Sequence, residues 1–239
     1  MVVHAMKRRT GKEREVSIAL SKVMLPGTLC VPKEAPGIAI FAHGSGSSRL
    51  SPRNQYVAAE LQSQGVGTLL FDLLTSEEEA FDERTGQLRF DIRLLAKRLV
   101  NVTHWVEGDS ETFGLRIGYF GASTGAAAAL AAAAQLPGKI SAVVSRGGRP
   151  DLAGEALPLV EAATLLIVGG NDESVLCWNR IALADLGCRD KRLEIIPGAT
   201  HLFEEEGALA NVAELAAAWF ASHFSESEQG QAHKTAQER

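Results

Sequence analysis

Short apolar runs alternate along this chain with longer segments of helical pattern, and no other feature limits the possible folds so strongly. The runs lie at residues 37–42, 66–71, 115–120, 140–145, 163–168 and 192–196, and helical segments separate them at 53–64, 88–106, 124–136, 174–186 and 208–224. Most runs are apolar throughout, which is typical of strands buried on both faces of a parallel sheet. Strands that alternate with helices form βαβ units, so we expect an α/β fold, a three-layer sandwich with a mostly parallel sheet.

The ends of the chain differ from this regular middle. Residues 13–20 and 22–31 predict two leading strands in an antiparallel meander, although Pro26 cannot donate a hydrogen bond to a strand ladder. No repeat or change of composition divides the rest, so residues 12–224 are interpreted as one domain. Residues 1–11 and 225–239 lack periodicity, and we expect both termini to be flexible.

The composition excludes several classes of partner. The chain has 239 residues, 46% of them hydrophobic, and a formal net charge of −5, so it can bury a large core but offers no basic surface for nucleic acid. Its N-terminus lacks the apolar stretch of a signal peptide, and no segment is apolar enough to span a membrane. The 3 cysteines are widely spaced, which predicts a reduced, cytoplasmic protein. No zinc-type ligand spacing occurs, so we expect no metal; a monomer and a homodimer both remain open.

A G-x-S-x-G motif lies at residues 121–125, between an apolar run and a predicted helix. A serine on such a tight strand-to-helix turn projects its hydroxyl above the end of the sheet, and the flanking glycines leave room for the turn. The N–H groups that begin the helix favour negative charge beside the serine. We therefore interpret Ser123 as a catalytic nucleophile, with a glycine-rich helix cap without chemistry as the alternative.

A nucleophilic serine needs a base and an acid, and candidates for both follow it along the chain. Asp172 lies in the loop after the fifth apolar run, and His201 lies in the loop after the last one. An imidazole takes the proton of the serine, and a carboxylate fixes the tautomer of that imidazole. In α/β-hydrolases the serine is followed by the acid and then by the histidine. Asp151 and Glu173 are alternative acids, and a loop histidine without chemistry is the alternative for His201.

A glycine-rich turn follows the first apolar run, with the sequence His43-Gly44-Ser45-Gly46-Ser47-Ser48. Backbone N–H groups from such a turn, and from the residue after the nucleophile, stabilise the negative oxygen of a tetrahedral intermediate. We expect this oxyanion hole to use the N–H groups of Ser45 and Thr124, with Gly46 as an alternative to Ser45. A phosphate-binding loop is disfavoured, because Arg49 stands where the third glycine of GxGxxG would be.

Taken together, the segments HGSGSS (43–48), GASTG (121–125), VGGNDESV (168–175) and PGATHLF (197–203) resemble the dienelactone hydrolase-like branch of the α/β-hydrolase superfamily. The resemblance covers about residues 15–224. It implies the α/β-hydrolase fold with an eight-stranded sheet, a catalytic triad of Ser123, Asp172 and His201, and no cofactor. Dienelactone hydrolases use cysteine at the elbow, so Ser123 favours a general carboxylic-ester hydrolase. The segment VVSRGGRPDLA (143–153) also looks like hydrolase domains that accompany phosphoribosyltransferases.

Loop lengths predict an open site and a small substrate. Residues 146–162, where many hydrolases insert a lid, have room only for a loop and a short helix, so we expect no lid domain. The polar segment 73–87 is expected to be a loop on the same rim. Arg49 and Arg146 are candidate substrate-binding residues for a carboxylate or phosphate group, with ion pairs to the acidic residues 76–83 as the alternative.

These observations predict a serine hydrolase whose partner is a small-molecule ester, without a nucleic-acid or membrane partner. Thioesterases, lactonases and peptidases use the same groups, so the bond that is cleaved stays open within this class. A binding or accessory module that has the fold but no activity is the alternative from outside it.

Overall fold

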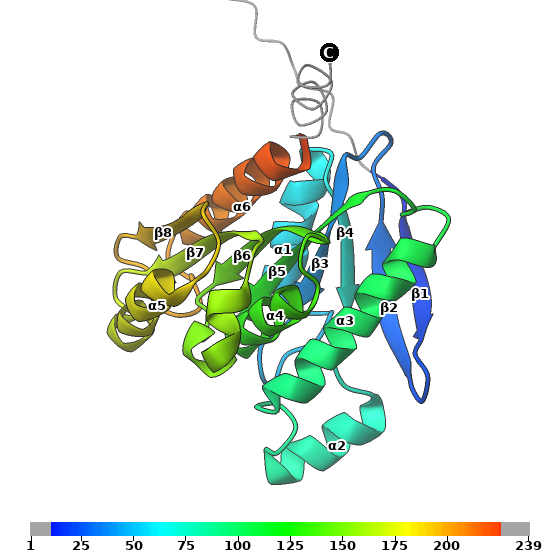
Figure 1. Cartoon of the computed structure of the whole chain (residues 1–239), viewed down its shortest axis with the longest axis horizontal. Helices are drawn as coiled ribbons and strands as arrows, with labels where there is room; N and C mark the ends of the chain where they lie inside the picture. The colour runs from blue at the N-terminus through cyan, green and yellow to red at the C-terminus, as the bar shows by residue number, and fades with distance from the viewer. Residues whose placement is uncertain (1–10, 226–239) are drawn as a thin grey trace, which may run out of the picture.

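The strands of this computed structural model form one sheet, and the structure describes residues 11–225 of the chain (Figure 1). The strands are β1 (Glu13–Ala19), β2 (Met24–Cys30), β3 (Gly37–Ala42), β4 (Gly67–Phe71), β5 (Arg116–Ala122), β6 (Ile140–Arg146), β7 (Ala163–Gly169) and β8 (Lys191–Ile196). Their order across the 8-stranded sheet is β1-β2-β4-β3-β5-β6-β7-β8. Strand β2 runs antiparallel to both neighbours, and all other neighbouring pairs are parallel. The expected mostly parallel sheet is confirmed.

Burial of both faces explains why the apolar runs become strands. Every residue of β3 and β4 is buried, whereas most residues of the edge strand β8 are partly or fully exposed. Pro26 lies inside β2 opposite Ser17, and its carbonyl accepts the Asp72 N–H at 3.1 Å. The proline keeps this acceptor although it has no N–H to donate, so β2 continues through it.

Two layers of helices cover the sheet. The helices are α1 (Pro52–Ser63), α2 (Ser76–Thr85), α3 (Ile92–Gly108), α4 (Thr124–Gln135), α5 (Glu173–Asp185) and α6 (Ala208–Ser225). On one face, α1 and α6 share an apolar core with the strands that includes Phe41 and Phe220. On the other face, α3, α4 and α5 share a second core that includes Leu99 and Tyr119 (Figure 1). The three-layer sandwich is therefore confirmed.

The segment at residues 73–87 is largely helical, so the expectation of a polar loop there is wrong. It contains α2, which begins with a capping box: the Thr75 hydroxyl accepts the Glu78 N–H at 3.2 Å, and the Glu78 carboxylate accepts the Thr75 N–H at 2.9 Å. Gly86 ends the helix in the left-handed conformation, with a φ of 65°. Such capping bonds stabilise the ends of a short polar helix, whose residues make no continuous apolar face.

Smaller differences lie elsewhere. Helix α3 is expected from residue 88 but begins at Ile92, because the Asp91 carboxylate caps it by accepting the Leu94 N–H at 3.0 Å. Between β6 and β7 the chain forms a 3-10 helix, η1 (Pro150–Leu159), which kinks at Gly154. This segment matches the loop and short helix expected there and adds no lid domain.

The flexible termini predicted from the sequence lie outside the described residues, apart from Gly11 and Ser225, the last residue of α6. Within residues 11–225, no helix combines the length and the apolar character that crossing a bilayer requires.

The chain leaves β3 and β5 in opposite directions, and this creates the place for a site. From β3 it passes through α1 on one face to β4, and from β5 it passes through α4 on the other face to β6. In open parallel sheets a crevice forms where the strand order reverses, beyond the carboxyl ends of the two strands. The turn at residues 43–51 and the serine at 123 both follow these strand ends, so both lie at the crevice.

Candidate active site

Ser123 forms the turn between β5 and α4 in a strained backbone conformation. Its φ is 51° and its ψ is −120°, a region that residues other than glycine rarely adopt. Neighbouring backbone groups hold it there: its N–H donates to the Arg146 carbonyl at 3.1 Å, and its carbonyl accepts the Arg149 N–H at 3.1 Å. This is the backbone conformation expected of a nucleophile elbow, in which the side chain projects above the end of the sheet.

Two glycines make this turn possible. A Cβ on Gly125 would lie 2.2 Å from the Ala42 carbonyl oxygen, and a Cβ on Gly121 would lie 2.4 Å from the Ala126 Cα. Both distances are far below van der Waals contact, and both neighbours are backbone atoms that no side-chain rotation can move. The glycines of the motif are therefore required by the close approach of β3, β5 and α4.

His201 and Asp172 follow neighbouring strands and form a hydrogen-bonded pair. Nδ1 of His201, in the turn after β8, lies 2.7 Å from Oδ2 of Asp172, which is the N-cap residue of α5. The Asp172 backbone is fixed by its own N–H, which donates to the Gly169 carbonyl at 3.0 Å. A carboxylate at Nδ1 makes that nitrogen a donor, so Nε2 is left to accept a proton.

Gly147 links the histidine to the serine. It directly follows Arg146, whose carbonyl accepts the Ser123 N–H, and a Cβ on Gly147 would lie 3.5 Å from Cε1 of His201. The space left by this glycine therefore lies beside the imidazole ring, and the preceding residue, Arg146, contacts the Ser123 backbone. The structure thus gathers Ser123, Asp172 and His201 at the carboxyl ends of β5, β7 and β8.

The alternative acids have other partners or positions. Asp151 forms a two-point ion pair with Arg149, whose Nε and Nη2 lie 2.9 and 2.7 Å from its carboxylate oxygens. The Arg149 guanidinium also lies over the Trp178 ring, 4.0 Å from its centre. Glu173 is the exposed first residue of α5. Of these candidates, Asp172 is the one that contacts the imidazole.

The glycine-rich turn after β3 is fixed by its own histidine. His43 is buried, with Nδ1 2.9 Å from the Gly44 carbonyl and Nε2 accepting the Leu73 N–H at 3.0 Å. Only a neutral ring with its proton on Nδ1 satisfies both contacts, and burial accordingly lowers the pKa of His43. The histidine therefore ties this turn to the segment that leads into α2.

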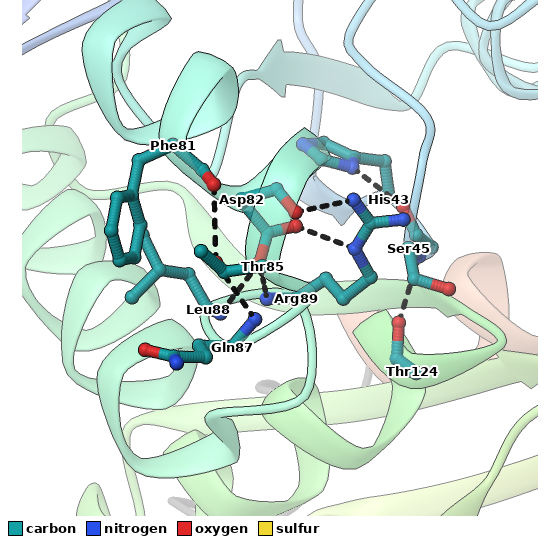
Figure 2. A network of polar contacts seen from close by, with 10 residues as sticks. His43, Ser45, Phe81, Asp82, Thr85, Gln87, Leu88, Arg89 and Thr124 are labelled. Carbon is teal, nitrogen blue, oxygen red and sulfur yellow. Dashed lines mark hydrogen bonds and ion pairs between the residues drawn. The ribbon is translucent and has the colours of Figure 1, made fainter.

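The two residues expected to form the oxyanion hole are in direct contact. The Ser45 N–H donates to Oγ1 of Thr124 at 2.9 Å (Figure 2). A Cβ on Gly44 would lie 3.2 Å from Cβ of Ser123, so this turn packs against the elbow. Thr124 is the first residue of α4, where backbone N–H groups have no carbonyl partner inside the helix. The Ser45 N–H is thus near the serine, but a side chain engages it.

A cavity of about 130 Å³ opens beside this contact. Its walls include Ser45 and Thr124, the apolar side chains of Leu74 and Leu95, and residues of α2. This space is enough for a short acyl group or for several water molecules, each of which takes about 30 Å³ in the liquid. Helix α2 lies beyond the end of β4 (Figure 1), and its residues Glu79, Asp82 and Glu83 form one wall of the cavity, where loop lengths predict an open rim.

An ion pair fastens α2 beside the cavity. Arg89 donates from Nε to Oδ2 of Asp82 at 2.5 Å and from Nη2 to the Asp82 carbonyl at 2.9 Å (Figure 2). Asp82 is 3% exposed and also accepts the Leu88 N–H at 2.6 Å. Burial raises the pKa of Asp82, but the hydrogen bonds and the charge of Arg89 outweigh it, and the pKa is lowered. Glu78 adds a second attachment, 2.5 Å from Arg98 of α3.

These residues of the cavity were not predicted from the sequence. The available signal was the T-x-x-E pattern at residues 75–78, which is the signature of a capping box and therefore of a helix start. Glu79 also lines the cavity; burial, together with the charges of Asp72, Glu83 and Asp82, raises its pKa. The cavity therefore combines apolar walls with a cluster of carboxylates and one paired arginine.

Arg49, a predicted substrate-binding residue, is held by carboxylates. Its backbone N–H donates to Oδ1 of Asp72 at 2.6 Å, its Nη1 donates to Oδ2 at 3.0 Å, and its Nη2 lies 3.5 Å from Glu15. The alternative prediction, that Arg49 forms an ion pair with acidic residues, is therefore correct about the type of interaction. The acidic partners are different ones, because neither Asp72 nor Glu15 belongs to residues 76–83.

Arg146, the other predicted substrate-binding residue, is buried and has no carboxylate partner among residues 11–225. It ends β6 with 8% exposure, and its Nη2 lies 3.4 Å from Oδ1 of Asn54. Its Nε and Nη1 have no hydrogen-bond partner within the described residues. Burial, with a contribution from nearby Arg53, lowers the pKa of Arg146 to about 10. A buried cation with free donors is costly unless an anion or water satisfies it.

The sheet order, the strained serine after β5 and the paired histidine and aspartate define the class of this protein, an α/β-hydrolase fold. No family model matches the chain. The crystal structure of a dienelactone hydrolase from Anabaena variabilis is 58% identical, with a TM-score of 0.87, over 90% of this chain and 99% of that one. The chain belongs to the dienelactone hydrolase family.

More distant and longer relatives extend the comparison. Est1E from Butyrivibrio proteoclasticus shares the fold at 17% identity, with a TM-score of 0.73, over 89% of this chain and 99% of that one. Proteins of two Mycobacterium tuberculosis strains, each named "Putative phosphoribosyl transferase", are 54% identical over 213 residues. These matches cover 89% of this chain but 47% of the relatives, so the chain spans about half the length of the curated relatives it matches.

Proposed function

We propose that this chain is a serine hydrolase that cleaves small carboxylic esters through an acyl-serine intermediate. The observation that carries the proposal is the 2.7 Å contact of His201 with Asp172, at the sheet edge where Ser123 is held in a strained elbow. The family to which the chain belongs consists of hydrolases with this fold, and the 58% identical dienelactone hydrolase supports the same class of reaction.

Acylation begins when Oγ of Ser123 attacks the ester carbonyl carbon. Nε2 of His201 takes the serine proton, and Asp172 stabilises the imidazolium through its bond to Nδ1–H. The electron pair of the carbonyl moves onto its oxygen, and the tetrahedral intermediate then expels the alcohol. The alcohol leaves with the proton that the histidine returns, and the acyl group stays on the serine.

Deacylation repeats these steps with water in place of the serine. Nε2 of His201 takes a proton from water, the hydroxide attacks the acyl carbon, and Ser123 leaves with the proton restored. Donors at the proposed oxyanion hole, which include the backbone N–H of Thr124, stabilise both intermediates. A donor of this kind lowers the activation barrier by roughly 3 kcal/mol.

The substrate is proposed to be a small ester, because the cavity beside Thr124 is short. Its apolar walls at Leu74 and Leu95 suit a short acyl or alkyl group. Of the two predicted arginines, Arg146 is the better candidate for binding an anionic group, since Arg49 is already paired with Asp72.

The Arg146 proposal is tested with a matched pair of esters that differ in one carboxylate. Replacing the arginine, as in Arg146→Gln, removes a charge-assisted hydrogen bond and should raise KM for the anionic ester about 10-fold more than for the neutral ester. Arg146→Lys keeps the charge, so its KM for the anionic ester should lie between those of the wild type and Arg146→Gln. Equal changes in KM for both esters would reject a role of Arg146 in substrate binding.

The names of the Mycobacterium tuberculosis relatives suggest phosphoribosyl transfer, but this chain matches only 47% of the length of those relatives, so the names do not assign that activity to the matched part. The candidate phosphate loop lacks the glycine of GxGxxG at Arg49, and that arginine is engaged by carboxylates. The proposal for this chain is therefore hydrolysis, with thioesters, lactones and amides as alternative substrates and a non-catalytic module as the alternative to an enzyme.

Labelling with a fluorophosphonate probe separates an enzyme from a non-catalytic module. The probe reacts with activated serines, so the wild type should gain the mass of one phosphonyl group and Ser123→Ala should gain none. Absence of labelling in the wild type would favour the non-catalytic module. Equal labelling of both proteins would mean that the probe reacts with a residue other than Ser123.

A panel of p-nitrophenyl esters then defines the acyl length. We expect kcat/KM to be highest for short acyl chains and to fall as the chain exceeds the cavity, with Ser123→Ala lowering kcat by on the order of 10⁴ to 10⁶. Near-normal hydrolysis by the alanine variant would end the proposal.

A further inference from the structure

The Thr124 side chain makes a contact that the backbone of the elbow does not require. Its hydroxyl accepts the Ser45 N–H at 2.9 Å, a contact between residues 79 positions apart (Figure 2). Thr124 is 2% exposed and lines the same cavity as Ser45 and Gly46. The hydroxyl therefore lies between the first turn of α4 and the turn after β3, beside the reactive serine.

This contact changes the expected composition of the oxyanion hole. A backbone N–H carries one proton, so the Ser45 N–H cannot bind the Thr124 oxygen and a substrate oxygen at full strength at the same time. A threonine hydroxyl has one proton to donate and two lone pairs that accept. Here one lone pair is used by Ser45, and the proton has no acceptor among residues 11–225.

The position of Thr124 explains why its proton is free. A threonine inside a helix commonly donates to the carbonyl four residues earlier. Thr124 opens α4, so the residue four positions before it is Phe120, which lies in β5 and not in the helix. The hydroxyl proton is therefore available to a group that enters the cavity.

We infer that the Thr124 hydroxyl is itself a donor of the oxyanion hole, so that this one residue supplies both a backbone N–H and a side-chain O–H to the substrate carbonyl oxygen. The Ser45 N–H acts behind it, by donating to Oγ1 and strengthening the O–H as a donor. When Oγ of Ser123 bonds to the carbonyl carbon, the carbonyl pair moves onto the oxygen, and Thr124 donates hydrogen bonds to that oxyanion without losing its proton. Thr124 is on this view a catalytic residue.

The inference rests on the proposed function, and two substitutions that leave the backbone donor in place test it. Thr124→Val keeps the shape but removes the hydroxyl, and should lower kcat on a p-nitrophenyl ester by roughly 10² to 10³ with little change in KM. Thr124→Ser restores the hydroxyl and should recover most of the activity. Because valine leaves the Ser45 N–H unpaired and could affect folding, Thr124→Ala and the melting temperature of each variant are measured as well.

A thionoester, in which sulfur replaces the carbonyl oxygen, gives a readout that a structural role would not move. Sulfur is a weak hydrogen-bond acceptor, so the hole contributes little to its hydrolysis. The wild type should exceed Thr124→Val by about 10²-fold or more on the oxygen ester but only a few-fold on the thionoester. A merely structural defect would lower both rates by the same factor, and that result would overturn the inference.

The remaining outcomes also decide the question. If Thr124→Val and Thr124→Ala hydrolyse the oxygen ester at the wild-type rate, the Ser45 N–H is the donor and the inference fails. If they are faster, the hydroxyl is a plug that substrate must displace, and the inference fails. In both cases hydrolysis that depends on Ser123 would leave the proposed function intact, whereas its absence in the wild type would overturn the proposed function first.

Discussion

The conformations of individual residues in this site are fixed by short contacts with their neighbours. Ser123 keeps a φ of 51° because its N–H is bonded to the last residue of β6 and its carbonyl to Arg149 in the turn that follows. Strain of this kind costs on the order of 1 to 3 kcal/mol and persists only where surrounding structure holds it. The neighbouring glycines leave room for the turn, and the contact with Asp172 orients the imidazole of His201, the proposed base.

The identity of the acid is tested by comparing two aspartates. Asp172→Asn should lower kcat by on the order of 10⁴, because an amide at Nδ1 favours the wrong tautomer of His201. Asp151→Asn should change kcat by only a few-fold, since its partner is Arg149. Steady-state kinetics on one ester measures both, and a larger loss from the Asp151 variant would assign the acid there.

The packing of the elbow is tested by adding one methyl group. Gly125→Ala places a Cβ 2.2 Å from the Ala42 carbonyl oxygen, so β3 and α4 must separate, and we expect stability to fall by about 3 kcal/mol. Gly108→Ala, at the end of α3, meets no atom within 4 Å and should be neutral or stabilise by up to about 1 kcal/mol. Urea unfolding compares the two; similar free energies of unfolding would contradict the packing argument.

At the scale of elements, α2 depends on polar contacts more than on apolar burial. Its capping box, the Asp82–Arg89 pair and the Glu78–Arg98 pair fasten it beside the cavity. Only Asp82 among its residues is buried. A helix held in this way opens more easily than α4, whose residues are nearly all buried in the core.

Asp82→Asn should therefore loosen α2 and lower the free energy of unfolding by about 2 kcal/mol at neutral pH. The folded pKa of Asp82 lies below its ordinary value of 3.8, so its stabilisation is fully present above that value and is lost as the pH falls through the folded pKa. The difference between wild type and variant should shrink below about pH 4.

Hydrogen exchange of residues 76–89 and urea unfolding at several pH values measure these effects, with the exposed Glu83→Gln as the control. Faster exchange in α2 is expected from Asp82→Asn alone. A difference in stability that stayed constant down to pH 3 would mean that the charge of Asp82 does not contribute.

At the scale of the whole molecule, the sheet divides the interior into two cores. One lies under α1 and α6 and contains Val57, and the other lies under α3, α4 and α5 and contains Val102. Both valines are fully buried. The proposed catalytic groups lie at the edge of the sheet, between the two cores, so the stability of each layer supports the same site.

Because the sheet separates the two cores, substitutions in them should act independently. Val57→Ala and Val102→Ala should each lower the free energy of unfolding by about 2 kcal/mol, through lost burial and a small cavity. The double variant should equal the sum within about 0.5 kcal/mol in urea unfolding. A coupling above about 1 kcal/mol would mean that packing strain passes through the sheet.

Features that depend on neighbours along the chain could be predicted from the amino-acid sequence. Alternating apolar runs and helical segments predicted the layers, since each pattern reflects the burial of a single element. The motif around Ser123 predicted the elbow, because a strand, a tight turn and a helix are contiguous there. The positions of Asp172 and His201 after two strands placed both at one sheet edge, because the carboxyl ends of parallel strands lie together.

The partner of each polar group, in contrast, could not be predicted before the packed fold was known. Arg49 pairs with Asp72, and the Ser45 N–H meets the Thr124 hydroxyl, in contacts that join segments far apart in sequence. The place of α2 beside the cavity depends likewise on Asp82 and on how the chain returns to α3. Hydrogen bonds act over about 3 Å and require defined angles, so such pairs are fixed only when the elements have packed.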